Sequence, residues 1–164
     1  MLAMKIRTIR TVSDFLLHIE RAKETEEKRG NKADFIFRGQ RTDKPLLPKL
    51  ARIAPKGKLL EIEQLIVKEF DRISVSLTDL RPTSPWESLS LAQHHGLPTR
   101  LLDWTYSALA GLWFAVEKEP KKKQAQPQSA VVWMLKTSVE DFIDESTRES
   151  HSRTGLPRSI VRRS

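Results

Sequence analysis

Apolar side chains recur at helical spacing in the first part of the chain and again near its middle. Ser13 and Asp14 are typical of a helix start, because a hydroxyl cap precedes an acidic residue in the first turn. Apolar residues as far as Ile19 then form one face, and Gly30 predicts the end of this helix. The same spacing from Leu59 to Leu77 predicts a long amphipathic helix.

A further helix is predicted from its capping residues. Ser84, Pro85 and Glu87 combine a hydroxyl cap, a proline at the first helical position and an acidic residue three positions after the cap. We expect this helix to end at His95-Gly96. The segment Thr105–Val116 is apolar on nearly every side, which predicts a helix that is buried all round.

Two short stretches of β-branched and aromatic residues predict strands, at Asp34–Arg38 and Ala130–Leu135. Gly39 directly follows the first of them, where a glycine often permits the close approach of another group. Prolines and a glycine make Arg41–Lys58 an expected ordered loop. Together these elements predict an α+β fold in which a small mixed β-sheet packs with several α-helices. All four tryptophans are expected in the core: Trp86, Trp104, Trp113 and Trp133.

Length and composition indicate one globular domain with a tail. Of the 164 residues, 38% are apolar, and no apolar run approaches the roughly 20 residues that a membrane helix needs. We expect a domain over residues 1–144 and a basic, poorly ordered or truncated tail over residues 145–164, because few apolar residues follow Asp144. The chain has no cysteine, which excludes disulfides, cysteine-ligated metals and thiol nucleophiles. A reducing, cytoplasmic location is expected, with no membrane partner.

The net charge of +8 is concentrated in two stretches. Residues 38–58 hold seven basic residues against one acidic residue, and residues 148–164 hold five against one. Such stretches suit anions, which include nucleic-acid phosphates, a phosphorylated small molecule and an acidic partner. A solvated basic surface explains them equally well.

The first candidate site is Phe37-Arg38-Gly39-Gln40. An arginine at the end of a buried strand presents a planar fork of donors, which can hold a phosphate or carboxylate at two points. Gly39 would let a ligand approach the backbone, and Gln40 adds an amide. The alternative is structural: Arg38 pairs with a carboxylate such as Asp103 and holds the domain together.

The second candidate site is the segment from Gln93 to Trp104, which surrounds a Gly/Pro turn. Adjacent histidines on a helix point about 100° apart, so they lack the spacing of a helical metal site, and no metal is predicted. Histidine can instead act as a general acid or base, or hold a ligand oxygen. The alternative is a polar helix end in which Asp103 caps the next helix. The ligand-binding candidates here are His94, His95, Thr99, Arg100 and Asp103.

These two segments resemble the FRG domain family, which is named for a Phe-Arg-Gly motif and carries a second motif similar to Gln93–Thr105. An apolar helix and a strand follow in the family, and they are matched by Ala108–Ala115 and Ala130–Leu135. The resemblance extends over Ile6–Leu135. It implies a named domain of unassigned activity from bacterial or phage proteins. Family members usually continue further, so residues 146–164 resemble a truncated end.

The resemblance and the residues together suggest a pocket for an anionic, nucleotide-like ligand around Arg38 and the His94–Asp103 segment. Some mono-ADP-ribosyltransferases also contain a strand that ends in aromatic-Arg-Gly, and a distant relationship would give Arg38 a pyrophosphate to hold. No catalytic residue or cofactor can be assigned from this similarity. Two alternatives remain open, a module that binds nucleic acid weakly through its basic loop and a non-catalytic interaction domain.

Overall fold

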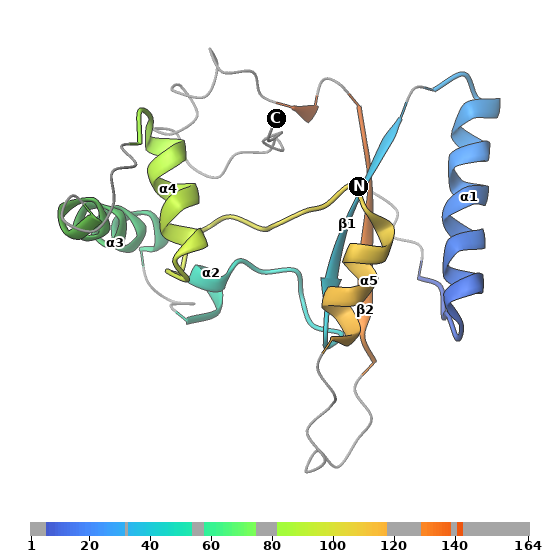
Figure 1. Cartoon of the computed structure of the whole chain (residues 1–164), viewed down its shortest axis with the longest axis horizontal. Helices are drawn as coiled ribbons and strands as arrows, with labels where there is room; N and C mark the ends of the chain where they lie inside the picture. The colour runs from blue at the N-terminus through green and yellow to red at the C-terminus, as the bar shows by residue number, and fades with distance from the viewer. Residues whose placement is uncertain are drawn as a thin grey trace, which may run out of the picture. The chain divides into compact units, whose positions relative to one another are not determined.

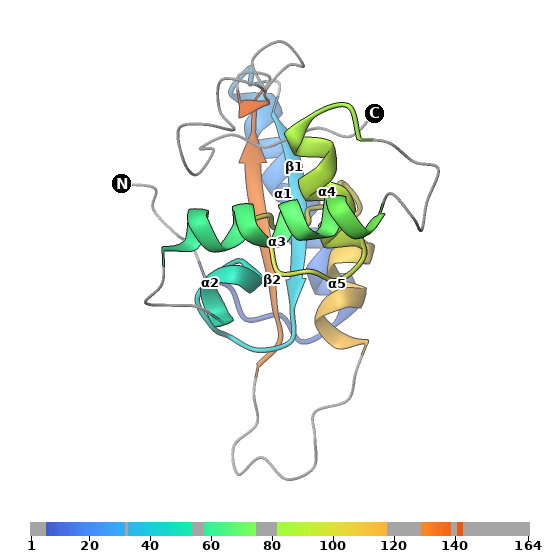
Figure 2. The ribbon, with the colours of Figure 1, turned by 90° about the vertical axis from the view of Figure 1, so that its left-hand side faces the viewer.

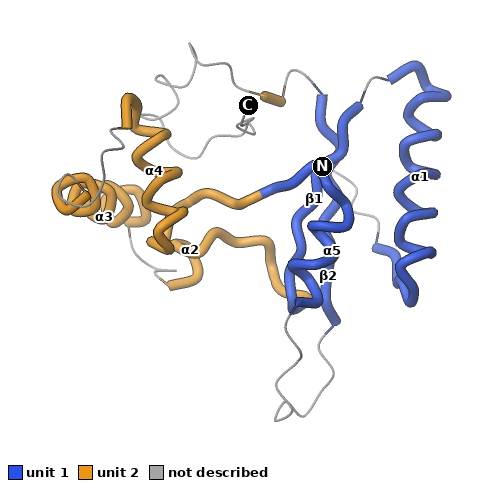
Figure 3. Tube along the Cα trace, viewed as in Figure 1, with its two compact units in different colours: residues 1–42, 104–138 blue, residues 43–103, 139–164 orange. Residues whose placement is uncertain are grey.

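The computed structural model describes residues 6–31, 33–53, 58–74, 82–117, 129–138 and 141–142 (Figure 1). It divides into two units, one of residues 1–42 and 104–138 and the other of residues 43–103 and 139–164 (Figure 3). Helices together with a two-stranded antiparallel sheet confirm the predicted α+β class. Within the described ranges, no helix has both the length and the hydropathy required to cross a bilayer.

The sheet of the first unit pairs β1 (Asp34–Gln40) with β2 (Val131–Thr137) in antiparallel register. Figure 2 shows the two strands side by side and running in opposite directions. Both predicted strands are confirmed, and each extends two residues beyond its predicted end. On the other edge of β1, Phe37 and Thr105 exchange backbone hydrogen bonds of 2.7 and 2.9 Å.

The N-cap of helix α1 (Val12–Lys28) lies two residues earlier than predicted. Thr11, not Ser13, is the N-cap, because the extended backbone at Thr11 lets its hydroxyl accept a 3.1 Å hydrogen bond from the backbone N–H of Asp14. The helix ends as predicted, with Gly30 at a φ of 73°. Its buried apolar side chains, Phe15 and Ile19, pack with Phe37 of β1 in the core of this unit.

Helix α5 (Ala108–Val116) packs against β1 through two glycines. A Cβ atom on Gly39 would lie 2.0 Å from the carbonyl oxygen of Gly111, and a Cβ atom on Gly111 would lie 2.9 Å from the Cβ atom of Phe37. Only residues without side chains permit this approach. The close approach expected at Gly39 is therefore made, in this unit, by the backbone of a helix.

Two predictions about α5 are wrong. Its N-cap is Ser107, which accepts a 3.2 Å hydrogen bond from the N–H of Ala110, so Asp103 does not cap it. The helix is also not buried all round, because only Gly111 and Ala115 are buried. Trp113 is 62% exposed and so lies outside the core, although Trp86 at 6% is buried as predicted. The other exposed apolar residues of the helix are Leu109, Phe114 and Val116.

The second unit contains the helices α2 (Lys49–Ile53), α3 (Leu59–Ser74) and α4 (Pro85–His94). Helix α2 lies inside the segment Arg41–Lys58, which was predicted as a loop, so that prediction is wrong for these five residues. So short a helix has too few residues to show a helical pattern in the sequence. The predicted cap of α4 is confirmed, since the hydroxyl of Ser84 accepts a 3.3 Å hydrogen bond from the N–H of Glu87. Helix α3 is confirmed as far as Ser74, and residues 75–77 lie outside the described ranges.

The contact of Gly39 with α5 predicts that one methyl group added at Gly39 strongly lowers the stability of the fold. We expect Gly39→Ala to lower the free energy of unfolding by about 3 kcal/mol, since a backbone oxygen occupies the space and α5 must shift. Gly30→Ala is the matched control, because a Cβ there meets nothing within 4 Å and only the positive φ costs about 1–2 kcal/mol. Urea unfolding of the three proteins measures both values. Equal losses in the two variants would contradict this packing.

Candidate functional site

Arg38 lies on the face of β1 opposite to Phe37 and Gly39, because successive strand residues point to opposite sides. Directly across the ladder stands Trp133, and opposed residues of an antiparallel pair share a face. The indole Nε1 of Trp133 is buried and makes no hydrogen bond within the part of the chain that the structure describes. Gln40, also on this face, donates from its amide to the carbonyl oxygen of Thr42 at 2.8 Å. This face therefore presents an arginine beside a buried donor.

In the second unit, residues of the second candidate site bond to one another. The hydroxyl of Thr99, 1% exposed, donates to the Oε1 atom of Gln93. The amide of Gln93 donates in turn to Asp103 Oδ1 at 2.5 Å. Thr99 also accepts a 3.3 Å hydrogen bond from the N–H of Leu101. This chain of bonds fixes the loop that follows α4 and accounts for Asp103 and Thr99 without a ligand.

Arg100 pairs with a residue that the sequence did not single out. Glu63 of α3 accepts from the backbone N–H of Arg100 at 2.6 Å and, with its other oxygen, from Arg100 Nε. The two side chains are 2% and 10% exposed, so this ion pair is buried. The sequence did not indicate Glu63, because it lies 37 residues from Arg100 on a helix whose apolar spacing predicted an apolar buried face. Arg100 retains one buried nitrogen, Nη1, that has no hydrogen-bond partner among the residues that the structure describes.

The two histidines lie at the exposed end of α4. Their rings meet edge to face with centroids 5.6 Å apart, and His95 lies the same distance from the ring of Phe70. Gly96 follows with a φ of 85°, and its carbonyl oxygen accepts a 2.5 Å hydrogen bond from Lys49 Nζ. The ammonium group of Lys49 therefore lies beside this turn.

The predicted pocket combines residues of different units. Arg38, Gly39 and Gln40 belong to the first unit, whereas the segment His94–Asp103 belongs to the second. Their convergence on one ligand stays a prediction, as does a pairing of Arg38 with Asp103. Among the described residues no group of three or more histidine or acidic side chains could hold a metal ion.

A second polar cluster, which the sequence did not suggest, ties α1 to β2. The carboxylate of Glu26 accepts hydrogen bonds from Lys136 at 2.7 Å, from Asn31 at 2.8 Å and from Arg29 at 3.1 Å. The hydrogen bond from Lys136, followed by that from Asn31, lowers the pKa of Glu26 to about 2. The charge of Glu26 is therefore a fixed part of the first unit at neutral pH.

Comparison with protein families gives one match, the FRG domain, over residues 33–124. The match covers more than half of the 164-residue chain and contains both candidate segments. The chain belongs to the FRG domain family. No protein of curated function and no solved structure matches it.

The FRG match begins after α1 and ends before β2. It includes the Phe37-Arg38-Gly39 motif and the loop that Arg100 and Glu63 hold together. The domain limits of 1–144 and the nature of the basic tail stay predictions, because residues 143–164 lie outside the described ranges.

The Glu63–Arg100 pair should be essential for the FRG domain's second unit. We expect Glu63→Ala to cost about 3–5 kcal/mol of unfolding free energy, because it leaves a buried guanidinium without its carboxylate. Glu69→Ala is the matched control on the same helix: Glu69 pairs with Arg72 at the surface, so stability should hardly change. Chemical denaturation compares the two. A Glu63→Ala protein as stable as the control would refute the role of this pair.

Acid should weaken the first unit through Glu26. Its pKa is lower in the folded than in the unfolded chain, so its stabilisation is complete above pH 4.5 and disappears as the pH falls toward about 2. We expect Glu26→Gln to be less stable than the wild type at pH 7 and equally stable near pH 2. Thermal unfolding from pH 7 to pH 2 tests this, with the exposed Glu24→Gln as control. Parallel curves for the wild type and Glu26→Gln would contradict it.

Proposed function

We propose that this FRG domain binds an anionic, nucleotide-like small molecule on the face of the sheet that carries Arg38. The observation that supports the proposal most directly is the buried indole Nε1 of Trp133, which has no acceptor among the described residues. A buried donor without a partner costs free energy, and a ligand oxygen would remove that cost. Its position across the ladder from Arg38 puts both donors on one face.

The chemistry of these two residues favours a phosphate or carboxylate. A guanidinium and an indole N–H only donate hydrogen bonds, so a ligand between them must supply acceptors. Arginine adds positive charge and a planar fork that matches two oxygens at once. The tryptophan ring adds a flat surface on which a base could stack. A nucleotide carries both phosphate oxygens and a base, and it therefore fits this pair better than a simple anion does.

The opposite face of β1 supports the same assignment. There the backbone of α5 covers Gly39, so the ligand would approach the strand from the Arg38 side. The similarity of the Phe-Arg-Gly strand to that of some mono-ADP-ribosyltransferases is consistent with a pyrophosphate as the bound group. Binding is all that we propose here; the carboxylate on this face of β1, that of Asp34, lies four residues before Arg38 at the start of the strand.

Titration calorimetry with ADP-ribose, with adenosine as the uncharged reference, tests this function. We expect ADP-ribose to bind and Arg38→Lys to lose that binding, because lysine keeps the charge without the fork. Trp133→Phe should weaken ADP-ribose binding by about 1.5–3 kcal/mol, a tenfold loss or more, since it removes one hydrogen bond to a charged group. The variant should lose no stability through a broken hydrogen bond, because Nε1 has no partner among the described residues.

Arg41→Lys is the matched control, since Arg41 is exposed and follows the strand. It should bind ADP-ribose as the wild type does. Equal affinity of the wild type and Trp133→Phe for ADP-ribose would refute the proposal. So would binding only to single-stranded nucleic acid with a steep salt dependence, which would instead favour the basic stretch of residues 38–58. An Arg38→Lys protein that unfolds while Trp133→Phe binds normally would assign Arg38 a structural role.

A further inference from the structure

Helix α5 presents a broad apolar face to solvent. Leu109, Trp113 and Val116 follow one another at helical spacing, Phe114 widens the row, and each of the four is more than half exposed. The helix has no charged residue, and its two buried residues lie on the opposite side, toward β1. At about 100° per residue, the exposed positions span roughly 160° of the helix, wider than the ~100° stripe with which a helix packs on one neighbour. This face therefore fits a broad surface better than a narrow groove.

The charge of the first unit indicates which kind of surface this face can meet. Counted by unit, residues 1–42 and 104–138 include 15 basic and 8 acidic residues, whereas the second unit includes 14 and 13. The unit that carries α5 therefore holds nearly all of the net charge of +8. A second copy of this chain brings the same positive charge and is repelled, whereas an anionic surface is attracted.

An anionic lipid bilayer combines the two properties that this face requires, an apolar interior and a negative surface. Basic residues are attracted to anionic head groups, and tryptophan is enriched where a bilayer meets water. We propose that the exposed face of α5 binds an anionic membrane surface, with Trp113 and Phe114 inserted at the level of the head groups. No membrane partner was expected from the sequence because no run of residues is long enough to span a bilayer, but a peripheral contact needs no such run.

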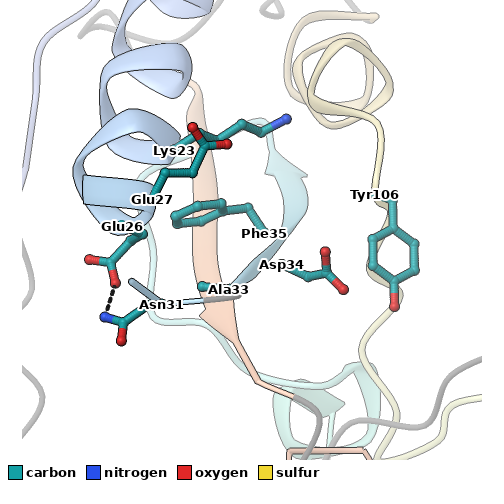
Figure 4. Close-up of a pocket in the computed structure, with 8 residues that line it drawn as sticks. All are labelled: Lys23, Glu26, Glu27, Asn31, Ala33, Asp34, Phe35 and Tyr106. Carbon is teal, nitrogen blue, oxygen red and sulfur yellow. Dashed lines mark hydrogen bonds between the residues drawn. The ribbon is translucent and has the colours of Figure 1, made fainter. Parts of the chain in front are cut away.

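The surroundings of Tyr106 determine which end of α5 inserts. Tyr106 precedes the helix and lines a cavity together with Asp34, two glutamates and one lysine. Figure 4 shows the carboxylate of Asp34 pointing toward Tyr106. Anionic head groups repel this end of the helix, so the inserted residues are those of its second half, Trp113–Val116. The contact is independent of the ligand proposed above, because α5 covers the side of β1 opposite to Arg38.

Co-sedimentation of the full chain with lipid vesicles in dilute buffer tests this surface. Vesicles of phosphatidylcholine with about 30% phosphatidylserine should bind the protein at least tenfold more tightly than vesicles of phosphatidylcholine alone, because several basic residues act together. Trp113→Ala and Phe114→Ala should each weaken binding to the anionic vesicles about tenfold, since a large apolar side chain no longer leaves water.

Val116→Asp and Val12→Asp are a matched pair of variants. Val116 ends α5 and Val12 begins α1 in the same unit, they are 56% and 55% exposed, and both changes add one negative charge. We expect Val116→Asp to weaken binding about tenfold more than Val12→Asp does, because only at Val116 must a carboxylate leave water. Equal losses would overturn the proposal, since they would indicate attraction by charge alone.

Tryptophan fluorescence reports whether Trp113 enters the bilayer. Lipids with bromine atoms on their acyl chains should quench the wild type, and Trp113→Phe, which keeps an apolar ring, should bind the same vesicles without that quenching. Quenching that persists in Trp113→Phe would place another tryptophan in the bilayer and overturn the assignment to α5.

Two further results would overturn the proposal. One is equal binding to neutral and anionic vesicles. The other is a dimer in dilute buffer without lipid that Trp113→Ala dissociates, as seen by sedimentation velocity, which would assign this face to a second copy of the chain. Circular dichroism shows whether each variant is folded. Should Trp113→Ala fail to fold, Phe114→Ala and the matched pair of aspartate variants still decide the matter.

Discussion

The backbone of α5 rests on the backbone of β1, and the first unit depends on that contact. Gly39 and Gly111 make it possible, because a methyl group at Gly39 would overlap a carbonyl oxygen. The contact determines which side of the strand faces inward, so Phe37 joins the core and Arg38 points the other way. The three residues of the Phe-Arg-Gly motif therefore differ in role. Phe37 packs in the core, Arg38 lies on the opposite face of β1, and Gly39 leaves the space that the backbone of α5 occupies.

Local sequence patterns predicted the helices and strands well, but they predicted less well how these elements pack and which of their residues are exposed. The cap of α4 was readable because Ser84, Pro85 and Glu87 act on one another within a single turn. The cap of α1 was placed wrongly, since Thr11 and Ser13 offer similar hydroxyls and only the backbone conformation separates them. The apolar composition of α5 predicted a helix but not its exposure, because composition does not specify how many neighbours surround an element.

The same difference applies to the candidate site: the sequence indicated its polar residues but not their bonding partners. The polar residues after α4 stood out in the sequence, yet a sequence cannot tell a residue that meets a ligand from one that bonds to its neighbours. Thr99 and Asp103 bond through Gln93, and Arg100 bonds to Glu63, a partner 37 residues away that no periodicity marks. Arg38 stood out equally, but its neighbour Trp133 became visible only with the register of the two strands.

The exposed side of α5 has a consequence for how the protein behaves at high concentration. The helix has no charged residue, and Leu109, Trp113, Phe114 and Val116 are each more than half exposed. At low ionic strength the net charge of +8 keeps copies apart over about 10 Å or more. Salt removes that repulsion and strengthens apolar association when the anion is sulfate or phosphate. This FRG domain should therefore stay dispersed in dilute buffer and self-associate as salt is added, the reverse of a protein held together by ion pairs.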